Sequence, residues 1–274
     1  MSLLLLLAAL LAPSEPITVM TYNLRYASEK GENRWSARVD LSAKTIRDSG
    51  ADLIGTQEGL YHQLVDLEER LPAYRWVGLG RRGGSRGEHM AVFYRRDRFE
   101  ALEYDHFWLS ETPREIGSKS FDADLPRMLT WVRFRDRATD RVFVLANTHF
   151  DHRSQNARER SAHLVAEWAG KIDAATPLVL TGDFNAEAKT NLAYGLLVND
   201  ELFSDTFSTA REKGEDHGTF HGFSGTPSKR GRIDWILTRG PLTCDATSIV
   251  ADGEDGRWPS DHFPVVARVR LDRD

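Results

Sequence analysis

Side chains suited to catalysis or metal binding fall at the ends of several expected β-strands. Six sites share this placement: Asn23 in TYNLR, Glu58 in TQE, His149 in NTHFDH, Asp183 with Asn185 in GDFN, Asp234 in RID, and Asp261 with His262 in SDHFPV. A single polar residue after a strand is most often a turn former. Six such sites in one chain favour a common pocket, because strand ends that open onto loops gather ligands and catalytic groups in layered α/β folds.

The residue types at these sites agree on a chemistry. Carboxylates and an asparagine carbonyl are hard oxygen ligands that suit Mg²⁺, Mn²⁺ or Ca²⁺ and do not suit copper. The chain has one cysteine, Cys244, which excludes a thiolate zinc cage and an intrachain disulfide. Two histidines with carboxylate partners can donate to a developing phosphorane, while a further aspartate deprotonates water. This combination predicts metal-assisted hydrolysis of a phosphate ester.

Hydrophobic periodicity places these residues on alternating strands and helices. Strands are expected at 17–24, 51–57, 75–80, 90–94, 128–135, 141–147, 177–181, 233–237, 247–250 and 265–269, and helices at 36–49, 60–71 and 156–172. The clearest hairpin joins 128–135 to 141–147 through a polar turn. Many strands with helices at intervals predict two packed sheets with helices outside. The chain has no internal repeat and no Ser/Gly/Pro-rich linker, so one domain is expected.

Read in order, and together with GEHMAVFYR, these motifs resemble the endonuclease/exonuclease/phosphatase superfamily. Its members include pancreatic deoxyribonuclease, abasic-site endonucleases, neutral sphingomyelinases, inositol-polyphosphate 5-phosphatases and nocturnin-like deadenylases. GDFN and SDH are short, but the ordered set is highly specific and extends over residues 17–269. The resemblance implies an α+β fold, a four-layer α/β/β/α sandwich of two mixed sheets flanked by helices, with the active site at one edge of the paired sheets.

The resemblance also implies roles for individual residues. Glu58 would be the principal ligand of Mg²⁺ or Mn²⁺, with Asn23 close to the metal and the phosphate and Asp261 as a further carboxylate. The expected catalytic groups are Asp183 to activate water, Asn185 to hold that carboxylate and a phosphate oxygen, His262 paired with Asp234, and His149 paired with Glu88.

Residues that contact the rest of the substrate are harder to choose. Asp151 and His152 follow the NTH strand end directly and could touch substrate or a second ion, although solvated loop residues are common at such places. Of the arginines at 25, 81, 127 and 158, we select Arg81 as a phosphate ligand, because it comes just after an expected strand and before the glycine-rich stretch 83–87. That stretch lacks the ending of a phosphate-binding P-loop.

The charge balance bears on the choice of substrate. The 274 residues contain 36 Lys and Arg against 41 Asp and Glu, a formal net charge of −5. This balance gives no support to a long nucleic-acid footprint. The complete catalytic set predicts a phosphodiesterase or phosphatase, with small-molecule, lipid or sugar phosphate esters and nucleic acid as nearly equal substrates. The alternative is a nuclease, an endonuclease or a deadenylase-like 3'-5' exonuclease acting on DNA or RNA, and a catalytically silent binding module is a distant third. No obligate protein partner is evident, and a monomer is expected.

The first residues have the character of a leader. Residues 3–12 are wholly apolar, too short to span a bilayer but of the length of a signal-peptide hydrophobic region. Met1 and Ser2 offer no basic side chain, and Ala12 is an atypical cleavage residue because Pro13 follows it. We expect residues 1–12 to be a signal peptide, residues 13–274 to form the domain, and the protein to be secreted or periplasmic.

Overall fold

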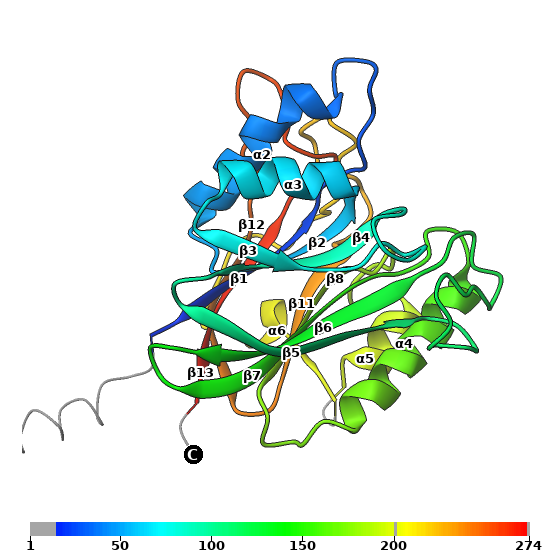
Figure 1. Ribbon diagram of the computed structural model, residues 1–274, viewed down its shortest axis with the longest axis vertical. Coiled ribbons are helices and arrows are strands. Elements are labelled where there is room, and N and C mark those ends of the chain that lie inside the picture. The colour runs from blue at the N-terminus through cyan, green and yellow to red at the C-terminus, as the bar shows by residue number, and fades with distance from the viewer. Residues whose placement is uncertain (1–14, 200–201, 273–274) are drawn as a thin grey trace, which may run out of the picture.

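Two mixed β-sheets, packed face to face, form the centre of this computed structural model (Figure 1), which describes residues 15–199 and 202–272. The expected signal peptide at 1–12 lies outside the described residues. In chain order the elements are β1 (Ile17–Asn23), α2 (Trp35–Ser49), β2 (Leu53–Gly59), α3 (Tyr61–Arg70), β3 (Tyr74–Val77), β4 (His89–Arg95), β5 (Phe99–Trp108), β6 (Met128–Asp136), β7 (Arg141–His149), α4 (Gln155–Gly170), β8 (Leu178–Asp183), α5 (Leu192–Leu197), β9 (Ser204–Asp205), α6 (Thr206–Thr209), β10 (Glu212–Lys213), β11 (Asp234–Arg239), β12 (Leu242–Ile249) and β13 (Val265–Leu271).

A parallel pair of strands lies in the middle of each sheet. The first sheet has the order β10-β12-β13-β1-β2-β4-β3 and the second β5-β6-β7-β8-β11-β9. β1 is parallel to β2, and β7 is parallel to β8. Parallel neighbours need a crossover connection, which α2 supplies for the first pair and α4 for the second. The carboxyl ends of the two strands of each pair therefore lie at the same edge of their sheet.

Helices cover the outer face of each sheet (Figure 1). α2 and α3 bury Ile46 and Leu64 against Ile54 of the first sheet, and α4 and α5 bury Val165 and Leu197 against the second. α2 ends at Gly50, whose left-handed backbone closes the last turn. The layers are thus α/β/β/α, and the predicted four-layer sandwich is confirmed.

The predicted hairpin of β6 and β7 is confirmed. Two other elements differ from the sequence-based prediction. The expected strand 75–80 is shorter, because β3 ends at Val77. β5 was not predicted: most of its residues between the two ends are charged or polar and only partly covered, since it is the edge strand of the second sheet. An edge strand needs few apolar side chains, so periodicity alone does not reveal it.

Among residues 15–199 and 202–272, none of the helices has the length and apolar character that crossing a bilayer would require.

Candidate active site

The site lies where the central strands of the two sheets end. Asn23 ends β1, Glu58 lies at the end of β2, His149 ends β7 and Asp183 ends β8. Asp234 begins β11 directly opposite Asp183, because these two strands are antiparallel and in register at that pair. The two crossover units therefore bring carboxylates, an amide and a histidine from both sheets to one edge of the sandwich.

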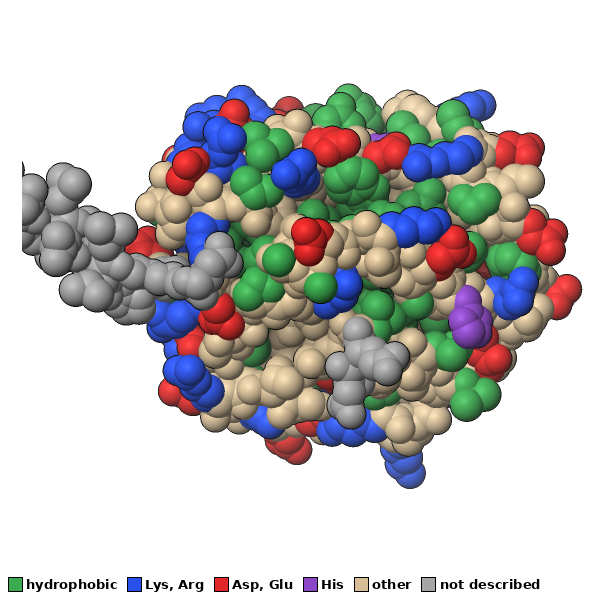
Figure 2. Space-filling model, turned by 90° about the horizontal axis from the view of Figure 1, so that it is seen from below, with side chains coloured by type: hydrophobic (Ala, Val, Ile, Leu, Met, Phe, Trp, Pro, Cys, Tyr) green, Lys and Arg blue, Asp and Glu red, His purple; other side chains and the backbone are tan. Residues whose placement is uncertain are grey.

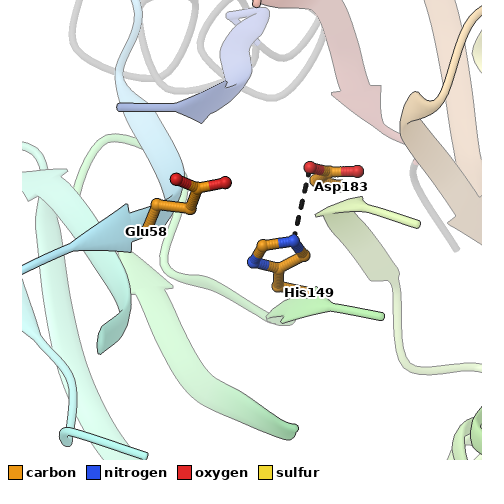
Figure 3. Close-up of side chains that lie close together, drawn as sticks. All are labelled: Glu58, His149 and Asp183. Carbon is orange, nitrogen blue, oxygen red and sulfur yellow. Dashed lines mark ion pairs between the residues drawn. The ribbon is translucent and has the colours of Figure 1, made fainter. Parts of the chain in front are cut away.

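Glu58 and Asp183 face each other across the gap between the sheets (Figure 3). The Asn23 side-chain amide donates to both, at 3.1 Å to Glu58 Oε1 and 2.9 Å to Asp183 Oδ2. Glu58 has a left-handed backbone, with φ of 61°, at a β-bulge between β2 and β4. A bulge of this kind re-aims a side chain at a strand end, and here the Glu58 carboxylate points toward the second sheet.

His262 is held by Asp234 on one side of Asp183. Its Nδ1 lies 2.9 Å from Asp234 Oδ2, and its Nε2 lies 3.9 Å from Asp183 Oδ2. Burial opposes the charged imidazolium, but the charges of Asp234 and Asp183 outweigh it and raise the pKa of His262 to about 10. His262 thus lines the cavity with its Nε2 on the side of Asp183.

Asp183 is a buried carboxylate with an unusual proton affinity. Burial and the nearby charge of Asp234 raise its pKa to about 7, although His262, the Asn185 backbone and the Asn23 amide act in the opposite direction. The Asn185 backbone N–H donates to Asp183 Oδ1 at 2.9 Å, from a residue with φ of 47°. A carboxylate with a pKa close to neutral is suited to accept a proton from water.

His149 contacts Asn185 and not the partner that the resemblance implied. Its Nε2 lies 3.0 Å from the Asn185 side-chain amide and 3.4 Å from Asp183 Oδ2 (Figure 3), while its buried Nδ1 has no hydrogen-bond partner. Burial lowers the pKa of His149 well below its ordinary value, and the charges of Arg127 and Arg81 lower it further. The expected pairing with Glu88 is not made: the Arg81 guanidinium donates to both Glu88 oxygens, at 2.8 Å each.

A cavity of about 690 Å³ opens above these groups. Its walls include Glu58, Glu88, His149, His152, Asp183, Asn185, Asp261 and His262, together with Phe220 and the arginines 25, 127, 158 and 230.

Arg81, the arginine selected from the sequence, is not among the lining residues, because it is buried against Glu88. The register of the hairpin could have identified Arg127 as a lining residue. Arg127 immediately precedes β6, at the edge of the sheet where β7 ends in His149. Phe220 and Arg230 lie between motifs and gave no such signal.

The structure separates the neighbours Asp151 and His152. Asp151 is fully buried, and its carboxylate accepts hydrogen bonds from the backbone N–H groups of Asp124, Arg153 and Ser154. This carboxylate organises the loop before α4 and does not line the cavity. His152 does line it, with Nδ1 3.1 Å from Arg127 Nη2.

The donor set at this edge fits a hard divalent cation. Ligand atoms of Glu58, His149 and Asp183 lie within 4.8 Å of one another. Asp261 is close by: Arg25 lies between it and Glu58, with Nε 3.6 Å from Asp261 Oδ2 and Nη1 3.8 Å from Glu58 Oε2. Burial and the charge of Glu58 raise the pKa of Asp261, although His262 acts against them. Crowded carboxylates of this kind repel one another, and a bound cation would relieve that repulsion.

Comparison with known proteins assigns the chain to a family. The model of the Endonuclease/Exonuclease/phosphatase family matches residues 20–262, which include all the strand ends described above. The chain belongs to this family, whose members hydrolyse phosphate esters.

Solved structures agree with this assignment. The chain is similar to an endonuclease/exonuclease/phosphatase family protein from Bacteroides thetaiotaomicron, with 35% sequence identity, a TM-score of 0.90, and coverage of 96% of this chain and 100% of that one. It is also similar to a mannosyl-6-phosphatase from the same organism, with 35% identity, a TM-score of 0.86, and coverage of 92% and 99%. The human Nocturnin catalytic domain, at 20% identity and a TM-score of 0.73 over 94% of each chain, shares the fold.

Proposed function

We propose that this protein is a Mg²⁺- or Mn²⁺-dependent hydrolase of small phosphate esters. The observation that carries the proposal is the convergence of Glu58, Asp183 and His262 on one cavity. These three groups are respectively suited to hold a cation, to accept a proton and to donate to a phosphoryl oxygen.

In the proposed reaction, a water molecule attacks phosphorus and the bond from phosphorus to the ester oxygen breaks. The leaving alkoxide takes a proton from solvent, and Asp183 later returns the proton of the attacking water to solvent. Asp183 accepts the proton of the attacking water, and the Asn185 backbone N–H fixes the orientation of its carboxylate. His262 donates from Nε2 to a phosphoryl oxygen, because Asp234 holds its Nδ1. Such a preorganised donor typically contributes ~10²- to 10³-fold in rate.

The metal would be held by Glu58, with Asn23 and Asp261 beside it. A divalent cation in that place would supply Lewis-acid stabilisation of the charge that develops on the phosphoryl oxygens. Asn23 joins this part of the site to the water-activating part, since its amide contacts both Glu58 and Asp183.

Three observations support a small substrate such as a sugar phosphate. The cavity of about 690 Å³ falls in the size range of small-molecule sites, roughly 300–1,000 Å³. A relative that is 35% identical is named a mannosyl-6-phosphatase. The formal net charge of −5 gives no support to a long nucleic-acid footprint, and basic and acidic side chains are interspersed on the face seen in Figure 2. A nuclease is the alternative. A silent binding module is disfavoured because Glu58, Asp183 and His262 are all present.

The test is a substrate panel with controlled metal. Purified protein is treated with EDTA, dialysed and assayed with p-nitrophenyl phosphate, bis(p-nitrophenyl) phosphate, mannose 6-phosphate, single-stranded RNA and duplex DNA, with and without Mg²⁺ or Mn²⁺. We expect hydrolysis of the small esters to disappear on chelation and to return with metal. Glu58→Gln should require a higher metal concentration for half-maximal activity.

Each contrary result has a definite meaning. Hydrolysis that is indifferent to chelation contradicts the metal requirement. Cleavage of RNA or DNA without turnover of the small esters replaces the proposed substrate class with that of a nuclease. Absence of all hydrolysis in metal-loaded protein supports the silent binding module.

A further inference from the structure

Arg127 occupies an unusual position among the groups around the cavity. It immediately precedes β6, and antiparallel pairing of β6 with β7 places it at the edge where His149 ends its strand. Its side chain lines the cavity although only 4% of it is exposed to solvent. It is therefore a buried positive charge on the His149 side of the site, across from the Glu58 side.

The buried guanidinium is poorly satisfied within the protein. Nη2 contacts the ring of His152 at 3.1 Å, but Nε and Nη1 are buried and have no hydrogen-bond partner. The nearest acidic oxygen, Asp151 Oδ2, lies 3.8 Å from Nε, beyond hydrogen-bonding distance, and the Asp124 N–H already donates to that oxygen. A buried arginine with free N–H groups is costly, and such groups usually have a partner in the functional state.

The other arginines at the cavity are different. Arg25 lies between two carboxylates, and Arg158 donates to the Gln155 side chain and the Asp151 carbonyl. Arg230 is exposed. The charge of Arg127 also acts on Glu88, but both Glu88 oxygens are taken by Arg81. Of the four arginines that line the cavity, only Arg127 combines burial with N–H groups that have no acceptor.

We propose that Arg127 binds the unesterified oxygens of a phosphate monoester and thereby makes this site selective for monoesters over diesters. The inference rests on the proposed function and deepens it. Arg127 would approach the phosphoryl group from the His149 side, while the groups around Glu58 approach it from the other sheet.

The charge and shape of the two ester classes explain the selectivity. A phosphate monoester carries about −1.5 to −2 charges near neutral pH and offers three oxygens as acceptors. A diester carries one charge and has lost one of those oxygens to its second substituent. A guanidinium binds two phosphate oxygens in a fixed fork, so a second ester group placed against Arg127 would remove one acceptor and leave a buried N–H without a partner.

The experiment compares the two ester classes in the full chain loaded with Mg²⁺. We would measure kcat and KM for p-nitrophenyl phosphate and bis(p-nitrophenyl) phosphate with wild-type protein, Arg127→Gln, Arg127→Lys and Arg127→Met. Wild type should prefer the monoester. Arg127→Gln should lower kcat/KM for the monoester by ~10- to 100-fold, as expected for the loss of a charge-assisted hydrogen bond, and change the diester value by less than about 3-fold. Arg127→Lys should recover part of the loss.

A matched control and a binding measurement separate this role from a general charge effect. Arg153→Gln removes the same charge from an exposed position beside the cavity, and it should change both ester values by less than about 2-fold. Calorimetry with inorganic phosphate should give a dissociation constant about 10- to 100-fold higher for Arg127→Met than for wild type. Thermal unfolding without phosphate should show Arg127→Met at least as stable as wild type, because the variant removes a buried charge with free N–H groups.

The outcomes distinguish the inference from the proposed function. Equal losses for the two esters, a wild-type preference for the diester, or unchanged phosphate affinity in Arg127→Met would overturn the role of Arg127. A less stable Arg127→Met protein with intact phosphate affinity would show that the residue is structural. If wild type hydrolyses neither ester, the proposed function fails, and phosphate affinity alone then decides whether Arg127 binds the anion.

Discussion

The space between the two sheets has two ends that differ in chemistry. Along each central strand, every second residue faces the other sheet. These inward residues change from apolar to polar toward the active site. The inward residues are Ile17, Val19, Thr21 and Asn23 on β1; Leu53, Gly55 and Gln57 on β2; Phe143, Leu145, Asn147 and His149 on β7; and Val179, Thr181 and Asp183 on β8. One end is thus a hydrophobic core, and the other is a buried polar layer that ends in the candidate catalytic groups.

A small network joins the sheets in the polar layer. The Gln57 amide donates to Asn147 Oδ1 at 2.7 Å, and the Asn147 amide donates to the carbonyls of Thr56 and Ala91 at 2.7 and 3.0 Å. Gly55 allows this close approach, because a Cβ there would overlap the Thr181 hydroxyl and lie 2.7 Å from Asn147 Oδ1. The apolar end therefore provides stability, while the polar end fixes the distance between Glu58 on one sheet and Asp183 on the other.

The sharpest test of this division is Asp183→Asn. We expect kcat to fall by ~10²- to 10⁴-fold, because the proton acceptor is lost. Stability should not fall, since the change removes a buried carboxylate close to Asp234. Urea unfolding of metal-free protein at several pH values, together with steady-state rates, would measure both effects.

The difference in stability between Asp183→Asn and wild type should depend on pH. Burial raises the pKa of Asp183 to about 7, so ionisation costs the folded state more as the pH rises from the ordinary value near 4 toward 7. The stability advantage of Asp183→Asn over wild type should therefore grow across that range and level off above it. A constant difference at all pH values would contradict the raised pKa.

At the apolar end, Phe134→Ala should have the reverse effect. Phe134 is fully buried in the inter-sheet core and packs against the rings of Tyr94, Phe99 and Phe143. Its truncation should lower the free energy of unfolding by ~3–5 kcal/mol. The rate per folded molecule should stay within about 3-fold of wild type, because the strand ends keep their positions. A large loss of kcat in the folded fraction would show that the two ends are not independent.

Gly55→Ala should affect both properties, with a smaller loss of stability. The added methyl group must push the sheets apart or displace the Asn147 network, at a cost of ~1–3 kcal/mol. Because small displacements of catalytic groups are expensive in rate, kcat should fall by up to ~10²-fold. Gly170→Ala is the matched control: it lies in α4, a Cβ there meets nothing within 4 Å, and neither activity nor stability should decrease. Normal turnover in Gly55→Ala would mean that the sheet spacing at this point does not govern the site.

Much of the fold could be predicted from the sequence because local patterns dictate it. The alternation of apolar residues in 141–147 and the turn that precedes it predict β7 and its hairpin with β6. The edge strand β5 could not be predicted in the same way, because its exposed residues carry no apolar period. The short elements α5, α6, β9 and β10 also could not be predicted from periodicity. They are stabilised by contacts with other segments in the second half of the chain.

The same distinction between local patterns and long-range contacts applies to the candidate site. The types of its groups and their places at strand ends follow from the sequence, since motif spacing and strand termini are local properties. The predicted residues that surround or line the one cavity are Asn23, Glu58, His149, Asp183, Asn185, Asp261 and His262. Which of these groups become partners depends on how the two sheets pack. Glu88 pairs with Arg81 and not with His149, Asp151 binds backbone amides, and Arg127 lines the cavity with Nε and Nη1 that have no hydrogen-bond partner. Pairing and burial depend on distances between segments that are far apart in the chain, such as Asn23 and Asp183 at a separation of 160 residues, and the packing of the two sheets sets these distances.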